Sequence, residues 1–327
     1  MERSGSMKIN SEYHTIGGEN IVEKNPEYAE YREKWHTYPK KRKVADFPLF
    51  LDIDITDRCN LKCSFCIRQS NPELVQNKKM RLPLFRKIID ESARNGLYGC
   101  KLSIIGEPLI HEHVFTMIKY AKNNGLIDVY FNTNATLLTE DVAHKLVESN
   151  LDRLSVSFEG YTKDVYERYR IGSNYSKVLN NIKRLQYVKE ELGAEHPKVR
   201  VQTVLLPELK DSIGGYINFW KPLVDEVGFL DYQPRVEERE VMQADWECQQ
   251  LYQRLGILVD GTIIPCNHDE RKLCYLGNVK NTSIKDAWHS HKLGLLRLQH
   301  KIGASHLVGC CKDCYLRQSE ILKERNK

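Results

Sequence analysis

The chain has 327 residues, of which 41% are hydrophobic and 28% charged, and its 49 basic and 44 acidic side chains give a net charge of +5. These values are typical of a globular protein with room for one large domain and a small one, and so mild a charge neither requires nor excludes an anionic partner. No apolar run approaches the roughly 20 residues that a membrane-spanning helix requires, and no secretory signal is visible. We therefore expect a cytoplasmic protein without a membrane partner.

Residues 1–48 are expected to form an N-terminal segment outside the main domain. Residues 1–6 have the composition of an expression-tag remnant, and the polar stretch after them contains an expected helix around Pro26–Trp35. The run Pro-Lys-Lys-Arg-Lys-Val at 39–44 matches a nuclear-import signal as a string of letters. Because short basic runs often match by chance, a solvated basic arm is the preferred interpretation.

Short β-rich runs alternate with amphipathic stretches of helical length from Leu51 onward. The expected strands are Leu51–Thr56, Lys101–Ile105, Asp128–Asn132, Arg153–Ser157, Lys198–Leu205 and Glu226–Tyr232. Strand–helix alternation predicts a parallel sheet, and six units are too few for an eight-fold barrel. The expected fold is therefore α/β, with a partial (β/α)6 TIM-like barrel over residues 49–236 and a small C-terminal domain over residues 237–327.

Local signals predict several helix boundaries. Pro83 is expected to open the first barrel helix, Gly96 to close it, and Thr139 to cap the helix before the fourth strand. In a longer helix near Ser176–Leu192, four apolar residues recur at helical spacing and are expected to face the sheet. These four are Val178, Ile182, Leu185 and Leu192.

Polar and apolar residues alternate within the strands. The side chains expected to face the helices are Ile53, Ile55, Leu154, Val156, Val199 and Val201, which leaves Asp54, Thr56, Ser155, Ser157, Arg200 and Gln202 inside. Fully buried parallel strands are usually apolar on both faces, so a polar inner face predicts a cavity for a polar ligand at the C-terminal mouth of the barrel. Arg200 and Gln202 are the candidate substrate-binding residues. A one-residue error in register is the alternative interpretation.

The ten cysteines are unevenly placed, with three between Cys59 and Cys66, one at Cys100 and six from Cys248 onward. Disulfides are rare in cytoplasmic proteins, where grouped thiols indicate metal or redox chemistry. Cys59, Cys63 and Cys66 follow the first strand, and three thiolates in eight residues can surround one face of a soft-metal centre. They leave one metal position for an exogenous ligand. A zinc ion with a fourth protein ligand from elsewhere is the alternative.

The C-x3-C-x2-C spacing, with an aromatic residue before the last cysteine, resembles the motif of the radical S-adenosylmethionine (SAM) superfamily. The resemblance implies a [4Fe–4S] cluster on Cys59, Cys63 and Cys66 whose open iron is chelated by SAM, with Phe65 beside the adenine. Ile105-Gly106-Glu107-Pro108 resembles the family's Gly-Gly-Glu segment, with Ile105 in place of the first glycine. By this resemblance, Gly106 and Glu107 hold the amino group of SAM.

Three later segments also resemble the family, in the expected order. Residues 132–136 and 155–160 resemble the segments around the SAM ribose and carboxylate, and residues 169–172 resemble a loop whose arginine points toward the SAM site. The further SAM-binding residues that the resemblance implies are Asn132, Asn134, Ser157 and Arg170.

The second cysteine group resembles the SPASM/twitch extension of radical SAM enzymes. Its pattern is Cys248-x12-Gly261-x4-Cys266, then Gly277-Asn278-Val279 and Cys311-x2-Cys314. The resemblance implies one auxiliary [4Fe–4S] cluster on Cys248, Cys266, Cys311 and Cys314, with Cys310 competing with Cys311, and a zinc ribbon is the alternative.

Cys100, Cys274 and Cys310 are left without an assigned ligand role. Cys274 and Cys310 are candidate donors of a hydrogen atom to a substrate radical, and ordinary buried cysteines are the alternative.

The resemblance implies a radical SAM oxidoreductase or epimerase. A reduced cluster cleaves SAM, and the 5′-deoxyadenosyl radical abstracts hydrogen from a substrate C–H bond. We expect a polar small-molecule substrate such as a sugar derivative, and a reducing partner such as flavodoxin or ferredoxin. Oxidation is favoured over epimerisation, because no spare cysteine lies at a strand end predicted to face the cavity.

Two other functions are weighed. The first is modification of a ribosomally made peptide, although residues 1–48 are too short for a winged-helix peptide-recognition domain. The second, more remote, is a zinc-containing nucleic-acid-binding protein, which leaves the barrel pattern unexplained.

Overall fold

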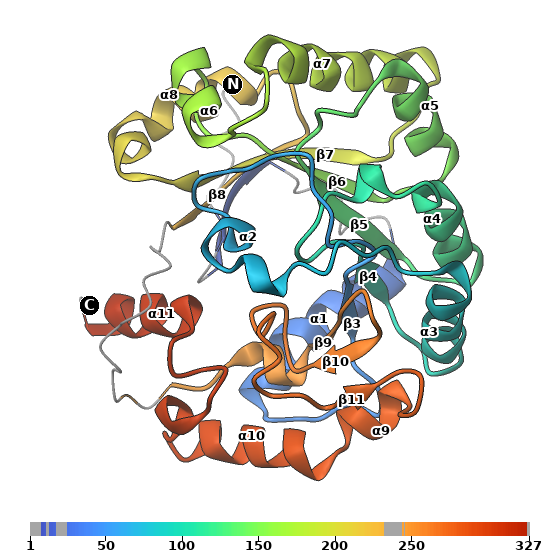
Figure 1. Ribbon diagram of the computed structural model, residues 1–327, viewed down its shortest axis with the longest axis vertical. Helices are drawn as coiled ribbons and strands as arrows, with labels where there is room; N and C mark the ends of the chain where they lie inside the picture. The colour runs from blue at the N-terminus through green and yellow to red at the C-terminus, as the bar shows by residue number, and fades with distance from the viewer. Residues whose placement is uncertain (1–7, 11–12, 18–24, 232–243, 245, 326–327) are drawn as a thin grey trace.

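The computed structural model of the protein describes residues 8–10, 13–17, 25–231, 244 and 246–325 (Figure 1). Through these residues runs one curved sheet of eleven strands in the order β1-β2-β8-β7-β6-β5-β4-β3-β9-β10-β11. Helices α3, α4, α5 and α7 lie along the outer side of the sheet, and α2 lies on its inner side (Figure 1). Within the described ranges, no helix combines the length and the apolar character that crossing a membrane requires.

The strands are β1 (Lys8–Asn10), β2 (Tyr13–Gly17), β3 (Phe50–Ile53), β4 (Gly99–Lys101), β5 (Asp128–Thr133), β6 (Arg153–Ser157), β7 (Lys198–Leu205), β8 (Glu226–Asp231), β9 (Arg254–Ile257), β10 (Thr262–Ile264) and β11 (Gly277–Asn278). The α-helices are α1 (Pro26–Lys40), α2 (Ile67–Ser70), α3 (Leu82–Arg94), α4 (Val114–Asn123), α5 (Glu140–Glu148), α6 (Lys163–Tyr169), α7 (Tyr175–Glu191), α8 (Ile213–Trp220), α9 (Ile284–Trp288), α10 (His291–Lys301) and α11 (Tyr315–Arg325). Short 3₁₀ helices are η2 (Pro72–Leu74), η3 (Pro108–Ile110), η4 (Pro207–Ser212), η5 (Gln249–Tyr252) and η6 (Ser305–Leu307).

Six parallel strands, β3 to β8, pair in chain order and form the partial barrel that the sequence predicts. β6 and β7 have the predicted bounds, whereas β4 is Gly99–Lys101 instead of Lys101–Ile105. The difference has a local cause. The backbone N–H groups of Ile104 and Ile105 donate to the Asp54 carboxylate, so this stretch leaves the sheet and forms a loop.

Both edges of the barrel sheet are extended by other parts of the chain. β9 pairs in parallel with β3, and β10 and β11 continue antiparallel, so the C-terminal region prolongs the sheet. At the other edge β2 pairs antiparallel with β8. The segment predicted as an N-terminal arm therefore contributes two strands and α1 to the fold. The predicted boundary between residues 236 and 237 lies outside the described residues.

Helix α1 packs against Phe50 of β3 and Tyr130 of β5, on the face of the sheet opposite to the one that helices α3, α4, α5 and α7 cover. Asn25 caps it by accepting from the backbone N–H groups of Glu27 and Tyr28, and a proline stands at its first position, as helix starts favour. Its aromatic side chains form a small cluster with the sheet, made of Tyr28, Tyr31, Trp35, Tyr38, Leu49, Phe50, Tyr98 and Tyr130. The basic run begins in the last turn of α1, where Pro39 is buried, and continues to Arg42, which pairs with Glu247.

The alternation predicted within the strands is observed. Ile53, Leu154, Val156, Val199 and Val201 are fully buried in the core beneath the helices, together with Cys100. On the opposite face, the Ser155 hydroxyl donates to Gln202, which confirms the predicted register.

The predicted apolar face of α7 is correct except at its end. Val178, Ile182 and Leu185 are fully buried, whereas Leu192 is 49% exposed because α7 stops at Glu191 and the chain turns at Gly193 with φ +59°. Val188 takes the inward position instead. Thr139 caps α5 as predicted, accepting from the backbone N–H of Val142.

Replacing Tyr31 tests the packing of α1. Its ring is 1% exposed and stacks on Tyr98 at 5.1 Å, so Tyr31→Ala should lower the free energy of unfolding by about 3 kcal/mol or more. Anaerobic urea unfolding measures the change, with the exposed Glu33→Ala on the same helix as control. Equal stability of the two variants would contradict a structural role for α1.

Candidate metal centres and cofactor site

The loop that carries Cys59, Cys63 and Cys66 lies between β3 and α2 and is hydrogen-bonded to a second loop. It follows β3, and α2 begins immediately after Cys66. Backbone hydrogen bonds join it to a later loop, from Lys62 N to Ile171 O at 3.0 Å and from Ser64 N to Tyr169 O at 3.3 Å.

Side-chain N–H donors from two other loops face the sulfurs of this loop. Asn134 Nδ2 lies 3.8 Å from Cys59 Sγ, and Arg170 Nη1 lies 3.7 Å from Cys63 Sγ. Both contacts favour thiolates, as expected around metal-bound cysteines. Burial raises the pKa of Cys63 to about 11, so the positive charge of a metal is what would keep this sulfur ionised.

The donor set of the loop suits an iron–sulfur cluster. Cys59, Cys63 and Cys66 are free cysteines on one loop, and cysteine thiolates are the ligands that such clusters take. The residues present therefore fit an iron–sulfur cluster.

Arg170 is held in place beside the cysteine loop. Its guanidinium forms a buried two-point ion pair with Glu159, with Nη2 2.9 Å from Oε1. It also lies over the ring of Phe65, 5.5 Å from the ring centroid. The structure thus brings together Phe65 and Arg170, both predicted to contact SAM.

Gly106 stands where the chain has no room for a side chain. A Cβ at this position would lie 2.0 Å from Thr56 O and 2.6 Å from Arg58 O, in the stretch leading to Cys59. The loop before Gly106 is fixed by Asp54, whose buried carboxylate accepts from the N–H groups of two neighbouring residues at 3.0–3.1 Å. Burial raises the pKa of Asp54 to about 7.

Glu107 connects the ends of β4 and β5. Its buried carboxylate accepts from Thr133 Oγ1 at 2.7 Å, from Asn134 N at 2.7 Å and from Leu109 N at 3.1 Å. Burial raises its pKa. Since Asn134 also contacts Cys59, Glu107 and the cysteine loop belong to one hydrogen-bonded network. Its predicted contact with the SAM amino group stays a prediction.

The other predicted residues lie farther along the same sheet. The Asn132 N–H donates to Ser103 Oγ at 3.0 Å, and Ser157 stands opposite Gln202 in the pairing of β6 with β7. Arg200 forms a two-point ion pair with Glu226 at 2.7 and 2.8 Å. Its guanidinium is therefore already engaged, and the substrate role of Arg200 and Gln202 stays a prediction.

The second cysteine group gathers in the C-terminal region. Burial raises the pKa of Cys266, and the nearby sulfurs of Cys248 and Cys314 raise it further. The pKa of Cys311 is raised in the same way, by burial and by the sulfurs of Cys266 and Cys314. The four cysteines predicted as auxiliary-cluster ligands thus interact with one another. Such crowded thiols can ionise together only around positive charge, so the set fits a metal centre.

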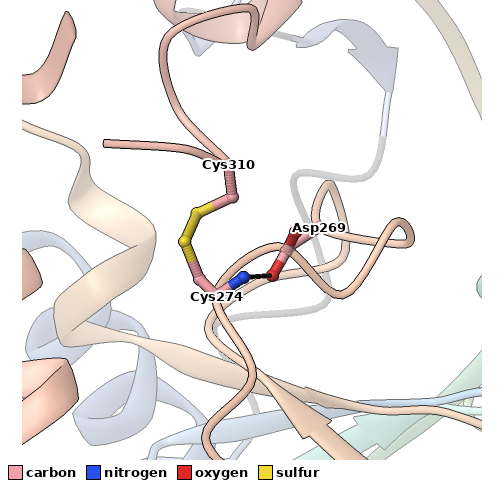
Figure 2. Close-up of side chains that lie close together, drawn as sticks. All are labelled: Asp269, Cys274 and Cys310. Carbon is pink, nitrogen blue, oxygen red and sulfur yellow. Dashed lines mark hydrogen bonds between the residues drawn. A yellow bond between two sulfur atoms is a disulfide. The ribbon is translucent and has the colours of Figure 1, made fainter. Parts of the chain in front are cut away.

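Cys274 and Cys310, the predicted hydrogen-atom donors, are bonded to each other in a disulfide (Figure 2). A disulfide has no S–H hydrogen to give, so in this form neither residue can perform the predicted role. While it is bonded to Cys274, Cys310 has no thiolate to offer a metal, and the preference for Cys311 as the ligand stays a prediction. The two cysteines are 36 residues apart in the sequence, and no local pattern indicated that they would be bonded to each other.

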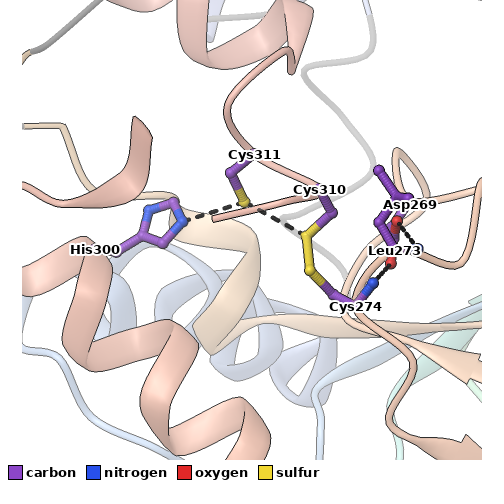
Figure 3. Close-up of a disulfide and its surroundings, with 6 residues drawn as sticks. All are labelled: Asp269, Leu273, Cys274, His300, Cys310 and Cys311. Atoms are coloured by element: carbon purple, nitrogen blue, oxygen red, sulfur yellow. Dashed lines mark hydrogen bonds between the residues drawn. A yellow bond between two sulfur atoms is a disulfide. The ribbon is translucent and has the colours of Figure 1, made fainter. Parts of the chain in front are cut away.

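His300 is a further residue of this region that the sequence did not reveal. Its fully buried ring lies between two of the predicted ligands, with Nδ1 accepting from Cys248 N at 3.2 Å and Nε2 3.3 Å from Cys311 Sγ (Figure 3). Burial lowers its pKa to about 4, so the ring is neutral and Nε2–H donates to the sulfur. Only the tertiary fold brings α10 to these cysteines.

Family models match both cysteine regions. The radical SAM superfamily matches residues 53–211, and the SPASM iron–sulfur cluster-binding domain matches residues 248–315. The chain is 25% identical over 320 residues to the tungsten-containing aldehyde ferredoxin oxidoreductase cofactor-modifying protein of Pyrococcus furiosus, covering 83% of this chain and 88% of that one. The chain is also 27% identical over 188 residues to the GTP 3′,8-cyclase of Limosilactobacillus fermentum. This match covers 57% of this chain and only 54% of the cyclase.

Solved structures share the fold. BtrN in complex with AdoMet and 2-DOIA matches with a TM-score of 0.59 at 18% identity, covering 82% of this chain and 92% of BtrN. SuiB of Streptococcus suis, bound to its precursor peptide SuiA, matches with a TM-score of 0.57 at 16% identity, covering 86% of this chain and 75% of SuiB.

Cluster content tests the two ligand sets. Anaerobically reconstituted protein should contain about eight iron and eight sulfide per chain, as two [4Fe–4S] clusters require. Replacing Cys59, Cys63 and Cys66 together by alanine should remove about half of both and abolish SAM cleavage. Metal analysis and 5′-deoxyadenosine formation measure these quantities. Full SAM cleavage by the triple variant would refute the catalytic ligand set.

Glu107→Ala tests the network behind the SAM site. Loss of a charged acceptor with three donors should weaken SAM binding about tenfold or more while iron content stays the same. Equilibrium titration of reconstituted protein measures the affinity, with the exposed Glu112→Ala as control. An affinity equal to that of the control would place the amino-group contact elsewhere.

Proposed function

Since the chain belongs to the radical SAM superfamily and carries a C-terminal SPASM iron–sulfur domain, we propose that it oxidises a polar small molecule, a sugar derivative, by abstracting a hydrogen atom from a C–H bond. When bound, the reduced catalytic cluster and SAM supply the radical, and the auxiliary cluster supplies an electron acceptor. Cys59, Cys63 and Cys66 hold the first cluster, and a flavodoxin or ferredoxin serves as its reductant.

In this proposal the chain's own residues bind the cofactors and orient the cysteine loop. Arg170, fixed by Glu159, places a positive charge beside Cys63 and faces Phe65. Glu107 and Asn134 hold the ends of β4 and β5 against the cysteine loop. Each of these groups is held by hydrogen bonds to its neighbours, and such fixed positions lower the cost of ordering a site on binding.

The polar inner face of the barrel is the observation that carries the substrate class. On β6 and β7 the helix-facing residues are apolar and fully buried, whereas the opposite face presents Ser155, Ser157, Arg200 and Gln202. Hydroxyl and amide groups in one short stretch of sheet, beside a guanidinium held by Glu226, suit a substrate rich in hydroxyl groups. BtrN, of the same fold, binds the small molecule 2-DOIA, which agrees with this choice.

The disulfide favours oxidation over epimerisation. An epimerase must return a hydrogen atom to the opposite face of the substrate radical, and the thiols predicted to give it, Cys274 and Cys310, are bonded to each other. An oxidation needs no donor and only has to pass one electron onward.

Modification of a peptide is the second candidate, because SuiB, of the same fold, binds a precursor peptide. Stimulation of SAM cleavage by peptides, but not by sugar derivatives, would favour this alternative.

Turnover in deuterated water tests the outcome of the reaction. Sugar nucleotides and amino sugars are first screened for stimulation of 5′-deoxyadenosine formation. With the active compound, product formed in deuterated water should contain no new carbon-bound deuterium, because oxidation returns no hydrogen to the reacting carbon. Mass spectrometry measures it. Deuterium at that carbon, lost in Cys274→Ser, would show that the protein is an epimerase.

A further inference from the structure

We propose that Cys274 and Cys310 form a redox-active disulfide that exchanges electrons with the auxiliary cluster through Cys311. The four predicted ligands Cys248, Cys266, Cys311 and Cys314 complete an auxiliary site without this pair. The pair is therefore available for chemistry of its own, and its position beside one ligand indicates which chemistry.

Direct contact between sulfurs connects the disulfide to the cluster ligands. Cys310 Sγ lies 3.7 Å from Cys311 Sγ, and His300 contacts Cys311 from the other side (Figure 3). Cys311 in turn interacts electrostatically with Cys266 and Cys314. An electron on the cluster would thus reach the disulfide across one van der Waals contact between sulfurs.

Cys274 is held opposite Cys310 by a tight turn. The Asp269 carboxylate accepts from the N–H groups of Leu273 and Cys274, both at 2.9 Å (Figure 3). Lys272 lies in the same turn with φ +61°. The turn is attached to the ligand loop by a hydrogen bond from Asp269 N to Cys266 O at 3.3 Å. Both ends of the disulfide are therefore anchored on segments that carry cluster ligands, Cys266 on one side and Cys311 on the other.

The disulfide is also close to solvent. Both cysteines are half-buried, and they are flanked by Leu273, which is 56% exposed, and by the exposed Gly309. A small dithiol or disulfide can reach the sulfurs from this side, as thiol–disulfide exchange requires. The pair thus lies between the cluster site and the solvent.

The electron balance of the proposed step is simple. Two electrons, delivered one at a time from the reduced auxiliary cluster, break the S–S bond, and two protons from water give the thiols of Cys274 and Cys310. An external disulfide of the thioredoxin class restores the bond by exchange and leaves as a dithiol. This role as an electron exit rests on the oxidation proposed above, whereas the redox coupling itself does not.

Electron counting tests the coupling without a substrate. Full-length protein with both clusters, oxidised and freed of thiols, is titrated anaerobically with dithionite. The wild type should take four electrons per chain, one for each cluster and two for the disulfide, and the Cys274→Ser/Cys310→Ser variant should take two. Iron content should be the same in both.

Thiol labelling gives the second readout. After reduction and an acid quench with iodoacetamide, peptide mass spectrometry should find Cys274 and Cys310 alkylated in the wild type. They should still be bonded in Cys314→Ala, whose loss of the auxiliary cluster is checked by its iron content. Equal reduction in the two proteins, or equal electron counts in the titration, overturns the proposal.

Two other results also overturn it. Alkylation of both cysteines before reduction would show free thiols, and an additional bound metal lost in the double variant would show that Asp269, Cys274 and Cys310 form a metal site. Neither result bears on substrate oxidation, which the deuterium experiment tests separately.

Discussion

The parallel pairing of β9 with β3 joins the two cysteine regions in one sheet. Asp52, on β3 and fully buried, lies 2.8 Å from Lys101 Nζ on β4 and 3.2 Å from Arg254 on β9. Burial alone would raise its pKa, but the two cations lower it below the ordinary value. A buried carboxylate between two cations tolerates no strand shift that separates it from either, because an unpaired buried charge costs several kcal/mol. The pairing of β9 with β3 therefore sets where the C-terminal cysteines lie relative to the loop of Cys59, Cys63 and Cys66.

A single polar network at the carboxyl ends of β3, β4 and β5 depends on that arrangement. Asp54 fixes the loop after β4, Gly106 packs against the stretch before Cys59, and Glu107 binds the first turn after β5. Asn134 links this network to the cysteine loop through the contact of its Nδ2 with Cys59 Sγ. Buried polar groups are stable only when their hydrogen bonds are made, so each of these residues limits the positions of the others. Such a network fixes the position of the cysteine loop relative to the ends of β4 and β5.

Periodicity predicted the parts of the fold that depend on local pattern, and contact between distant segments decided the rest. The bounds of β6 and β7 follow from alternation of apolar and polar residues, which is a property of each strand alone. β4 was wrong because the N–H groups of Ile104 and Ile105 bind Asp54, fifty residues earlier, instead of a neighbouring strand. Cys59, Cys63 and Cys66 could be proposed as cluster ligands from the sequence because all three lie within one loop. His300 and the Cys274–Cys310 bond carry no such local signal, since their partners meet only after folding.

The ten cysteines take different chemical roles because their surroundings differ. Cys100, fully buried in the apolar core and with its pKa raised by burial, has no route to solvent or metal and acts as a packing residue. Cys311 has the opposite environment, with the His300 N–H on one side and the Cys310 sulfur on the other. A hydrogen bond to a ligand sulfur stabilises the more negative, reduced state of a cluster, and so raises its reduction potential. The role of Cys311 as a ligand stays a prediction. In that role, its hydrogen bond to His300 would raise the reduction potential of the auxiliary cluster at the same sulfur through which, in our proposal, the electrons leave.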